Sequence, residues 1–263
     1  MSNLTLLRSY ALKTNPASLP PSVLFSHTEN TLTIYDAYPK SIFHFLILPR
    51  TNAFLPLSVF DLTNLRTLLK GNKERAKEVI STLNDEATKL KKEIEEEMVN
   101  RYGFKWDIWM GFHPVPSMEH LHLHVLSADL RSPSMKTKKH YNSFRPKLGF
   151  FQHIDDVLSW FDAEPSYFNK MSELKKSKYE PLLKENLTCF RCDAMFKNIP
   201  TLKSHLEEEW NKLVQKEKAK HAKQSKRRRE TEDAKSTTSH GDSSSGTPPK
   251  RQKLESPPDD VTS

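Results

Sequence analysis

The chain has 263 residues, of which 36% are hydrophobic and 28% are charged, with a formal net charge of +8 and a pI near 9.3. The low hydrophobic share predicts that part of the chain lies outside any packed core, and the positive charge favours a polyanionic partner, nucleic acid before a membrane surface. Membrane-spanning and secreted classes are disfavoured, because no apolar run reaches about 18 residues and the N-terminus lacks a basic segment followed by an apolar one.

The first fifth of the sequence predicts one short helix followed by three strands. Leu4, Leu7 and Leu12 recur at helical spacing, and the prolines from residue 16 onward end this helix, which we place at 4–13. Runs rich in β-branched and aromatic residues at 23–25, 31–35 and 43–48 then predict strands. The last of the three is apolar throughout except for His44, and Pro49 closes it.

Residues 61–100 predict a long helical region. Two apolar stripes at helical spacing run along it, and Gly71-Asn72 interrupts the pattern between them, which predicts two helices. The charged residues of this region are typical of a solvated helix face with i,i+4 pairs. We therefore expect the helices to pack on a sheet and assign them no chemistry. A strand is predicted next over 104–112.

Residues 120–126 alternate histidine with aliphatic side chains. This is the two-residue period of a half-buried strand, so the aliphatic residues are expected in the core. His120, His122 and His124 are then expected in a row on the opposite face, about 6–7 Å apart. Three interpretations fit such a row: a solvent-facing strand, a zinc or iron site, and a phosphate site in which a neutral histidine is the nucleophile. The strand alone does not distinguish the last two.

A zinc finger is predicted near residue 200. Cys189 and Cys192 form a Cys-x-x-Cys motif, and His205 follows at the spacing of ββα fingers. Glu209 lies four residues further on the same helix face and is expected as the fourth ligand, with Glu208 as the alternative. A finger this small needs its metal to fold, so we expect structural zinc. Both cysteines belong to this motif, which leaves none for a disulfide and favours a reducing compartment.

Beyond about residue 210 the sequence becomes polar, first rich in lysine and then in serine, threonine and proline. Such a composition does not bury a core, so residues 216–263 are predicted to be a disordered basic tail. Basic patches at 226–229 and 248–253 are typical of nuclear localisation signals and predict a nuclear protein, with the cytoplasm as a second compartment. Nonspecific DNA binding by the same tail is compatible with this prediction.

Several motifs together resemble the histidine-triad superfamily of nucleotide hydrolases and transferases, and more narrowly its aprataxin branch. The resemblance covers about the first 210 residues. It is carried by Gly111-Phe112-His113-Pro114-Val115-Pro116-Ser117-Met118 directly before the histidine run, by Tyr38-Pro39-Lys40 with His44, by Ser132-Pro133-Ser134-Met135-Lys136, by Lys139-His140-Tyr141-Asn142-Ser143-Phe144, and by the two-Cys, His, Glu pattern of the finger, which some fungal members share.

This resemblance implies an α+β fold in which a mainly antiparallel sheet and packed helices form a histidine-triad domain over residues 1–165. A small ββα zinc finger would follow over 166–215, and the tail over 216–263. The implied activity is hydrolysis of AMP from the 5′ ends of DNA left by abortive ligation, which restores a 5′-phosphate, and it extends to guanylate caps on 3′ ends. The alternatives are a general nucleoside-phosphoramidate or dinucleoside-polyphosphate hydrolase and a noncatalytic DNA-end-binding scaffold.

The same resemblance assigns roles to single residues. His122 is the expected nucleophile, because an imidazole near its reference pKa of ~6.5 is largely neutral at pH 7 and forms a covalent His–AMP intermediate without a metal. The other implied site residues are His113 and His124 in catalysis, Lys40, His44, Ser117 and His120 at the nucleotide and phosphate, and Lys136, Lys139 and His140 at the DNA. The N-terminal helix would wedge against the DNA end. The implied partners are adenylated nicked or double-stranded DNA and the product AMP, with no membrane, and the protein is expected to be a monomer.

Overall fold

The computed structural model describes residues 3–51 and 57–238, without the side chains of residues 3, 226 and 228–238. The chain divides into two units, residues 1–216 and 217–263. The second basic patch, at 248–253, lies outside the described residues. In the described ranges no helix is both long enough and apolar enough to span a membrane.

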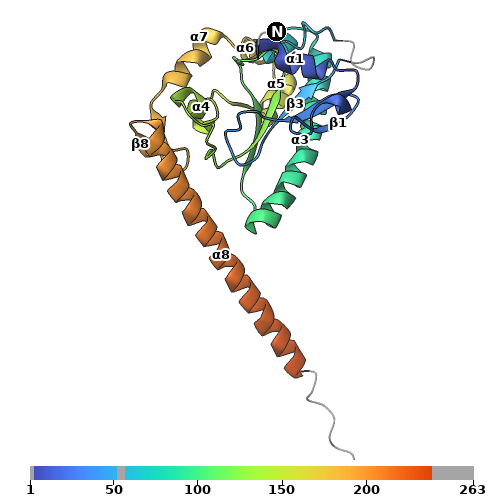
Figure 1. The fold of residues 1–263 in the computed structure, drawn as a ribbon. Helices are drawn as coiled ribbons and strands as arrows, with labels where there is room; N and C mark the ends of the chain where they lie inside the picture. The colour runs from blue at the N-terminus through green and yellow to red at the C-terminus, as the bar shows by residue number, and fades with distance from the viewer. Residues whose placement is uncertain (1–2, 52–56, 239–263) are drawn as a thin grey trace, which may run out of the picture. The chain divides into compact units, whose positions relative to one another are not determined.

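The first unit is built on a six-stranded antiparallel sheet with the strand order β1-β2-β3-β5-β4-β6 (Figure 1). Its strands are β1 (Leu24–His27), β2 (Thr31–Tyr35), β3 (His44–Pro49), β4 (Ile108–Phe112), β5 (Leu123–Ser127) and β6 (Gln152–His153), and a second small sheet pairs β7 (Leu187–Thr188) with β8 (Met195–Phe196). The α-helices are α1 (Leu6–Ala11), α2 (Leu65–Leu69), α3 (Lys73–Tyr102), α4 (Lys138–Asn142), α5 (Ile154–Asp162), α6 (Pro165–Ser172), α7 (Lys176–Tyr179) and α8 (Ile199–Thr238). Short 3₁₀ helices are η1 (Asn3–Thr5), η2 (Pro16–Ser18), η3 (Pro146–Leu148) and η4 (Glu180–Lys184). The α+β class and the antiparallel sheet agree with the prediction.

Helix α3 covers one face of the sheet. It starts after Asn72, whose side chain accepts a hydrogen bond from the backbone N–H of Arg75 (2.9 Å), and it ends at Gly103, which has a left-handed φ of +80°. The interruption predicted at Gly71-Asn72 is therefore the N-cap of this helix. Its apolar stripe and the sheet share one core, which includes Phe45, Ile47, Ile80, Leu83, Leu123 and Val125.

The opposite face of the sheet carries a smaller apolar cluster beside the histidines. In this cluster α1 packs on strands β2 and β3 through Leu7, Ala11, Leu32, Ile34, Leu46 and Leu48. Leu46 pairs with His124 across β3 and β5, so the two side chains project from the same face. His44, two residues before Leu46, projects from that face as well. The sheet thus sets two imidazoles against an apolar surface.

The predicted row of three histidines does not form. Strand β5 begins at Leu123, and His120 precedes it with a φ of +91°, which is outside the extended region. The alternation of a strand therefore does not apply to His120, whose ring bonds to the carbonyl of Pro49. The aliphatic residues of the motif are buried as predicted. Strand β4 is also shorter than predicted, because it begins at Ile108 rather than at residue 104.

The elements after residue 165 share one apolar core with α3 and the sheet, and the division predicted at residue 165 stays a prediction. Trp210 of α8 packs edge-on against Trp106 with ring centroids 4.7 Å apart, and Phe168 and Tyr179 belong to the same cluster. The tail also differs from the prediction, because residues 217–238 continue α8 as a helix. From Thr201 to residue 238 the sequence has no glycine or proline and is rich in lysine, glutamate, alanine and arginine, which are strong helix formers.

Candidate active site and zinc finger

A cleft of about 470 Å³ gathers most of the predicted site residues on the histidine face of the sheet. Apolar side chains of Leu7, Leu46 and Met118 line part of the cleft, and imidazoles and lysines line the rest. A site of this kind offers a surface for a nucleobase next to donors for a phosphate. The predicted residues that line it are Lys40, His44, His113, Ser117, His122, His124, Lys136, Lys139 and His140.

His122 is held as one tautomer with a free nitrogen. Its Nδ1–H donates to the carbonyl oxygen of His120 (2.7 Å), so in the neutral ring Nε2 keeps its lone pair. Burial lowers the pKa of His122, although the His120 carbonyl and the nearby Asp36 carboxylate act in the opposite direction. The imidazole is therefore neutral at pH 7, which is the state required of a nucleophile.

A chain of hydrogen bonds fixes the tautomers of His44 and His124. The backbone N–H of Lys40 donates to Nδ1 of His44 (3.0 Å), so the proton of His44 is on Nε2, which donates to Nδ1 of His124 (3.0 Å). The proton of His124 is then on Nε2, a buried atom with no hydrogen-bond partner among the described residues. Such a donor is suited to an oxygen of a bound phosphate.

The same hydrogen bonds bear on whether the histidines bind a metal ion. Asp36, His44 and His124 bring donor atoms within 4.8 Å of one another. A metal on Nε2 of His44 would move the proton of that ring to Nδ1, where it would face the N–H of Lys40, a donor against a donor. The donor set therefore favours a shared proton between the two imidazoles over a metal ion.

His113 packs against His124, with ring centroids 4.4 Å apart, and its Nε2–H donates to the carbonyl oxygen of Ser143 (3.2 Å). Burial and the neighbouring histidines lower the pKa of His113 to about 3. The ring of His113 is therefore neutral at pH 7 and its Nε2 proton is engaged by Ser143, so it packs against His124 in this state. A part for His113 in catalysis stays a prediction.

His120 contributes through its backbone rather than its ring. The ring is fully buried and bonds through Nε2 to the carbonyl oxygen of Pro49 (2.7 Å), and it does not line the cleft. Its left-handed backbone turns its own carbonyl toward Nδ1 of His122. The predicted contact of His120 with the nucleotide phosphate stays a prediction.

The rim of the cleft is basic. Lys40 bonds through Nζ to the carbonyl of Tyr38, and burial lowers the pKa of its ammonium group. Lys136 and Lys139 are exposed, and His140 is half-buried and accepts the backbone N–H of Lys136 at Nδ1 (3.2 Å). Burial also lowers the pKa of His140, so its ring is neutral at pH 7. The rim charge therefore comes from the lysines.

One buried carboxylate was missed by sequence reasoning. Asp129 accepts hydrogen bonds from the backbone N–H groups of Ile42 (3.0 Å) and Arg131 (3.3 Å), from the indole of Trp106 (3.4 Å) and from the hydroxyl of Ser127. It thereby ties the segment before His44 to the end of β5. The available signal was an acidic residue placed directly after an apolar strand.

The buried histidines give the fold an acid-sensitive stability. Burial lowers the pKa values of His44 and His120 to about 4, against an ordinary value of 6.5 in the unfolded chain. Below pH 6.5 the unfolded chain binds protons that the folded chain does not, so the free energy of unfolding falls, by about 1.4 kcal/mol per pH unit for each such histidine. Urea unfolding at pH 7.0, 6.0 and 5.0 should show this loss. A free energy of unfolding that is flat across this range would contradict the buried neutral state.

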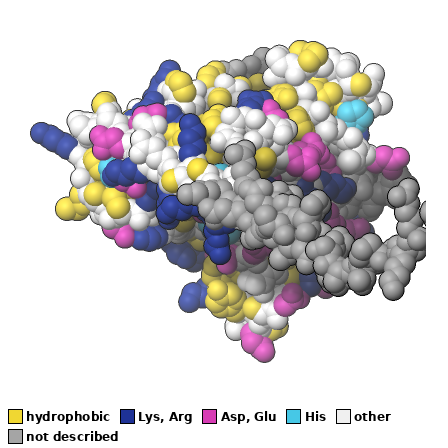
Figure 2. All heavy atoms as spheres, turned by 90° about the horizontal axis from the view of Figure 1, so that it is seen from below, with side chains coloured by type: hydrophobic (Ala, Val, Ile, Leu, Met, Phe, Trp, Pro, Cys, Tyr) yellow, Lys and Arg dark blue, Asp and Glu magenta, His cyan; other side chains and the backbone are white. Residues whose placement is uncertain are grey.

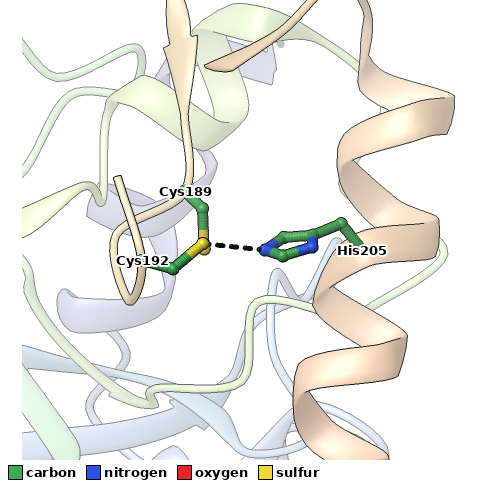
Figure 3. A group of neighbouring side chains, drawn as sticks. All are labelled: Cys189, Cys192 and His205. Atoms are coloured by element: carbon green, nitrogen blue, oxygen red, sulfur yellow. Dashed lines mark hydrogen bonds between the residues drawn. The ribbon is translucent and has the colours of Figure 1, made fainter. Parts of the chain in front are cut away.

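The finger brings three metal-ligand side chains together (Figure 3). The donor atoms of Cys189, Cys192 and His205 lie within 4.8 Å of one another, and Sγ of Cys192 is 3.2 Å from Nε2 of His205. Two thiolates and an imidazole are the donor set of zinc. Glu209 lies outside this cluster, and its carboxylate bonds to Nζ of Lys212 (2.9 Å). Three of the four predicted ligands are therefore in place.

Two family models match the chain. A scavenger mRNA decapping enzyme C-terminal binding model matches residues 12–140, and a C2HE / C2H2 / C2HC zinc-binding finger model matches residues 147–212. The first covers strands β1 to β5 of the sheet together with helices α2 and α3. The second covers α5 to α7, the segment from Cys189 to Cys192, which we call the cysteine knuckle, and the first part of α8.

The chain is similar to several curated proteins along most of its length. The aprataxin-like protein of Drosophila melanogaster is 34% identical over 187 residues, which is 71% of this chain but 24% of that protein. Aprataxin of Ciona intestinalis is 32% identical, and this chain spans 42% of it. The aprataxin-like protein of Saccharomyces cerevisiae is 32% identical over 217 residues, 77% of this chain and 95% of that protein.

Solved structures of Hnt3 have the same fold. The crystal structure of the aprataxin ortholog Hnt3 from Schizosaccharomyces pombe matches with a TM-score of 0.56 and 26% identity, over 81% of this chain and 93% of that one. Hnt3 in complex with DNA and guanosine matches with the same TM-score and identity over 80% and 96%. The sheet, the tautomer-fixed histidines and the cysteine knuckle agree with these similarities, and the chain belongs to the aprataxin-like family, a histidine-triad fold followed by a zinc finger.

Proposed function

We propose that the protein is a DNA 5′-adenosine monophosphate hydrolase that removes AMP from abortive ligation intermediates. The observation that carries the proposal is the hydrogen bond from Nδ1 of His122 to the carbonyl of His120, which leaves Nε2 as a free nucleophile in a cleft of about 470 Å³. The relatives named aprataxin and the Hnt3 complex with DNA support a DNA substrate. Removal of guanylate from 3′ ends is a second reaction that the same site would perform.

In the first step, Nε2 of His122 attacks the phosphorus of the adenylate. A P–N bond forms, the bond from phosphorus to the oxygen of the DNA 5′-phosphate breaks, and the 5′-phosphate leaves with the electron pair. Since this leaving group is already a stable phosphate anion, it needs no strong general acid. The Nε2–H of His124 donates to a nonbridging oxygen of the adenylate, where negative charge builds up.

In the second step, water attacks the phosphorus of the His122–AMP adduct. The P–N bond breaks, AMP is released with the oxygen of water, one proton passes to solvent, and Nε2 regains its lone pair. The hydrogen bond from Nδ1 of His122 to the His120 carbonyl holds the ring still through both steps and stabilises the positive charge that the ring carries in the adduct. Two easier displacements thereby replace one difficult displacement. In this mechanism His122 and His124 carry out both steps without a catalytic metal.

Zinc would be held by Cys189, Cys192 and His205 and would supply structure to the finger rather than chemistry to the cleft. Glu209 is proposed as the fourth ligand. It lies one turn after His205 on α8, and rotation of its side chain away from Lys212 would bring its carboxylate toward the cluster.

Replacing Glu209 by alanine should lower zinc affinity by at least about 10- to 100-fold, because even the loss of a group that only supports a ligand has an effect of this size. Replacing the exposed Glu208 by alanine is the matched control and should leave zinc affinity within about twofold, because surface changes away from such features have small effects. Competition with a colorimetric chelator measures both. A larger loss in Glu208→Ala than in Glu209→Ala would reverse the assignment.

The DNA backbone is proposed to lie along the basic rim. Lys136 and Lys139 are exposed at the cleft, and His140 lines the cleft and accepts the backbone N–H of Lys136. Figure 2 shows Lys and Arg side chains interspersed with Asp and Glu on one face, so local clusters rather than net charge would define the contact. Phosphate contacts of this kind give affinity without sequence preference.

The protein is further proposed to act as a monomer in the nucleus, with DNA and AMP as partners and with its basic tail patches as localisation signals. Two other functions compete. A general nucleoside-phosphoramidate or dinucleoside-polyphosphate hydrolase would use the same His122 but would not need the basic rim. A DNA-end-binding scaffold would use the rim but would not need the free nitrogen of His122.

Single-turnover AMP release from a nicked duplex with a 5′-adenylate separates the three functions. Diadenosine tetraphosphate is the comparison substrate, and the same nick with a plain 5′-phosphate measures binding alone. The proposed function predicts faster release from the adenylated nick and a restored 5′-phosphate. Faster cleavage of diadenosine tetraphosphate would favour the general hydrolase, and binding without release would favour the scaffold.

A further inference from the structure

Tyr141 connects the cysteine knuckle to the catalytic region. Its ring is fully buried, and its hydroxyl donates to the carbonyl of Thr188 (2.9 Å) and accepts the backbone N–H of Phe190 (3.0 Å). These two backbone groups flank Cys189, the buried ligand of the predicted zinc site. The hydroxyl is therefore hydrogen-bonded to the backbone on both sides of Cys189. Apolar packing of the ring alone would not require these two bonds.

The segment that carries Tyr141 also shapes the cleft. The carbonyl of Ser143 accepts the Nε2–H of His113, and the ring of Phe144 packs on three imidazoles. The ring centroid of Phe144 is 4.7 Å from that of His113, 5.2 Å from that of His124 and 5.4 Å from that of His44. Residues 141–144 thus contact the backbone on both sides of Cys189 at one end and the imidazoles of His44, His113 and His124 at the other.

Two further contacts make this segment rigid. The buried amide of Asn142 donates to the carbonyls of Leu183 (3.3 Å) and Glu185 (2.8 Å), in the stretch that leads into the finger. Cys189 and Phe144 belong to one apolar cluster. A shift of the knuckle would therefore move the side of the cleft formed by Ser143 and Phe144, since a close-packed core transmits displacements.

We propose that Tyr141 is a positioning residue that couples the zinc knuckle to the catalytic cleft, so that loss of zinc slows hydrolysis of an adenylate too small to reach the finger. This inference rests on the proposed hydrolase function. It gives the finger a second role besides holding DNA, because the knuckle then sets the positions of His113 and His124. The chemistry itself stays with His122.

The test compares wild type with Tyr141→Phe, which removes only the hydroxyl, and with Cys192→Ser, which removes an exposed ligand and leaves the core intact. Tyr167→Phe is the matched control, since Tyr167 is 47% exposed and lies outside both sites. Zinc affinity is measured with a competing chelator, and kcat and KM are measured with adenosine 5′-phosphoramidate, with zinc bound and after stripping. Imidazole ¹⁵N signals report the cleft independently of turnover.

Tyr141→Phe is expected to bind zinc about tenfold more weakly, as when a buried donor loses its partner. Its kcat is expected to fall about fivefold with little change in KM, because misplaced groups slow the chemical step more than binding. Stripping zinc from wild type and the Cys192→Ser change should lower kcat similarly and shift the signals of His113 and His124. The control should change neither zinc affinity nor kcat.

Weaker zinc binding with unchanged kcat and unchanged imidazole signals would overturn the coupling. A fall in kcat with unchanged zinc affinity would also overturn it, because Tyr141 would then only pack the cleft. If wild type does not hydrolyse the phosphoramidate, the proposed function fails for small adenylates, and the ¹⁵N signals still decide the coupling. Signals that move on stripping zinc support it, and signals that stay overturn it.

Discussion

Replacing His122 by alanine should lower single-turnover release of AMP from an adenylated nick by at least about 10⁴-fold, the size of loss seen when a nucleophile is removed. The reason is specific to this site, because the Nδ1–H of His122 is committed to the His120 carbonyl and Nε2 is the free atom. No neighbouring imidazole substitutes for it. The Nε2–H of His44 donates to Nδ1 of His124, and the Nε2–H of His113 donates to the carbonyl of Ser143.

The covalent intermediate provides a second readout. Acid quenching destroys a phosphoramidate and alkali preserves it, so wild type should yield an alkali-stable AMP adduct and His122→Ala none. His27→Ala is the matched control, since His27 is exposed on β1 and lies outside the cleft. Equal AMP release by wild type and His122→Ala would remove His122 from the nucleophile role.

Replacing Asp129 by alanine should lower the free energy of unfolding by about 3–5 kcal/mol, because several buried donors would lose their common acceptor. These are the backbone N–H groups of Ile42 and Arg131, the indole of Trp106 and the hydroxyl of Ser127. Urea unfolding at pH 7 measures the loss. Activity should fall as well, since the segment that ends at His44 would lose its anchor.

Two further variants serve as controls for Asp129→Ala. Asp129→Asn keeps the volume and one acceptor oxygen and should lose less stability than Asp129→Ala. Asp85→Ala, on the exposed side of α3, should change the free energy of unfolding by less than about 0.5 kcal/mol. A loss below about 1 kcal/mol in Asp129→Ala would mean that water replaces the carboxylate, and the anchoring role would be wrong.

The sequence allowed much of the fold to be predicted, where local patterns decide structure. The break at Gly71-Asn72 marked the start of α3, because an asparagine caps a helix through its own side chain. The strand and core positions of the aliphatic residues around His122 followed from the two-residue period. The cysteine and histidine spacing of the finger gave three ligands that the structure brings together.

Other features depend on contacts between distant segments and are not encoded in local spacing. His120 leaves the strand pattern because its backbone turns to meet His122 and its ring bonds to Pro49, 71 residues earlier. The carboxylate of Asp129 is held by Trp106 and Ile42, which no periodicity connects. The helical state of 217–238 was missed because the composition of a disordered tail and that of a solvated helix overlap.

The shared core has a consequence for how the chain is cut by proteases. Trp210 of α8 packs in the same cluster as the residues of α3 and β5, so the histidine fold and the finger should open as one cooperative unit. The exposed Lys216 is the last residue of that unit, and Lys218, Lys220 and Lys223 follow it on α8. Limited trypsin digestion of the native protein should therefore trim the chain near these lysines and leave one resistant fragment. It should not release the finger, since Phe168, Tyr179 and Trp210 are buried in the core that the finger shares with α3 and the sheet.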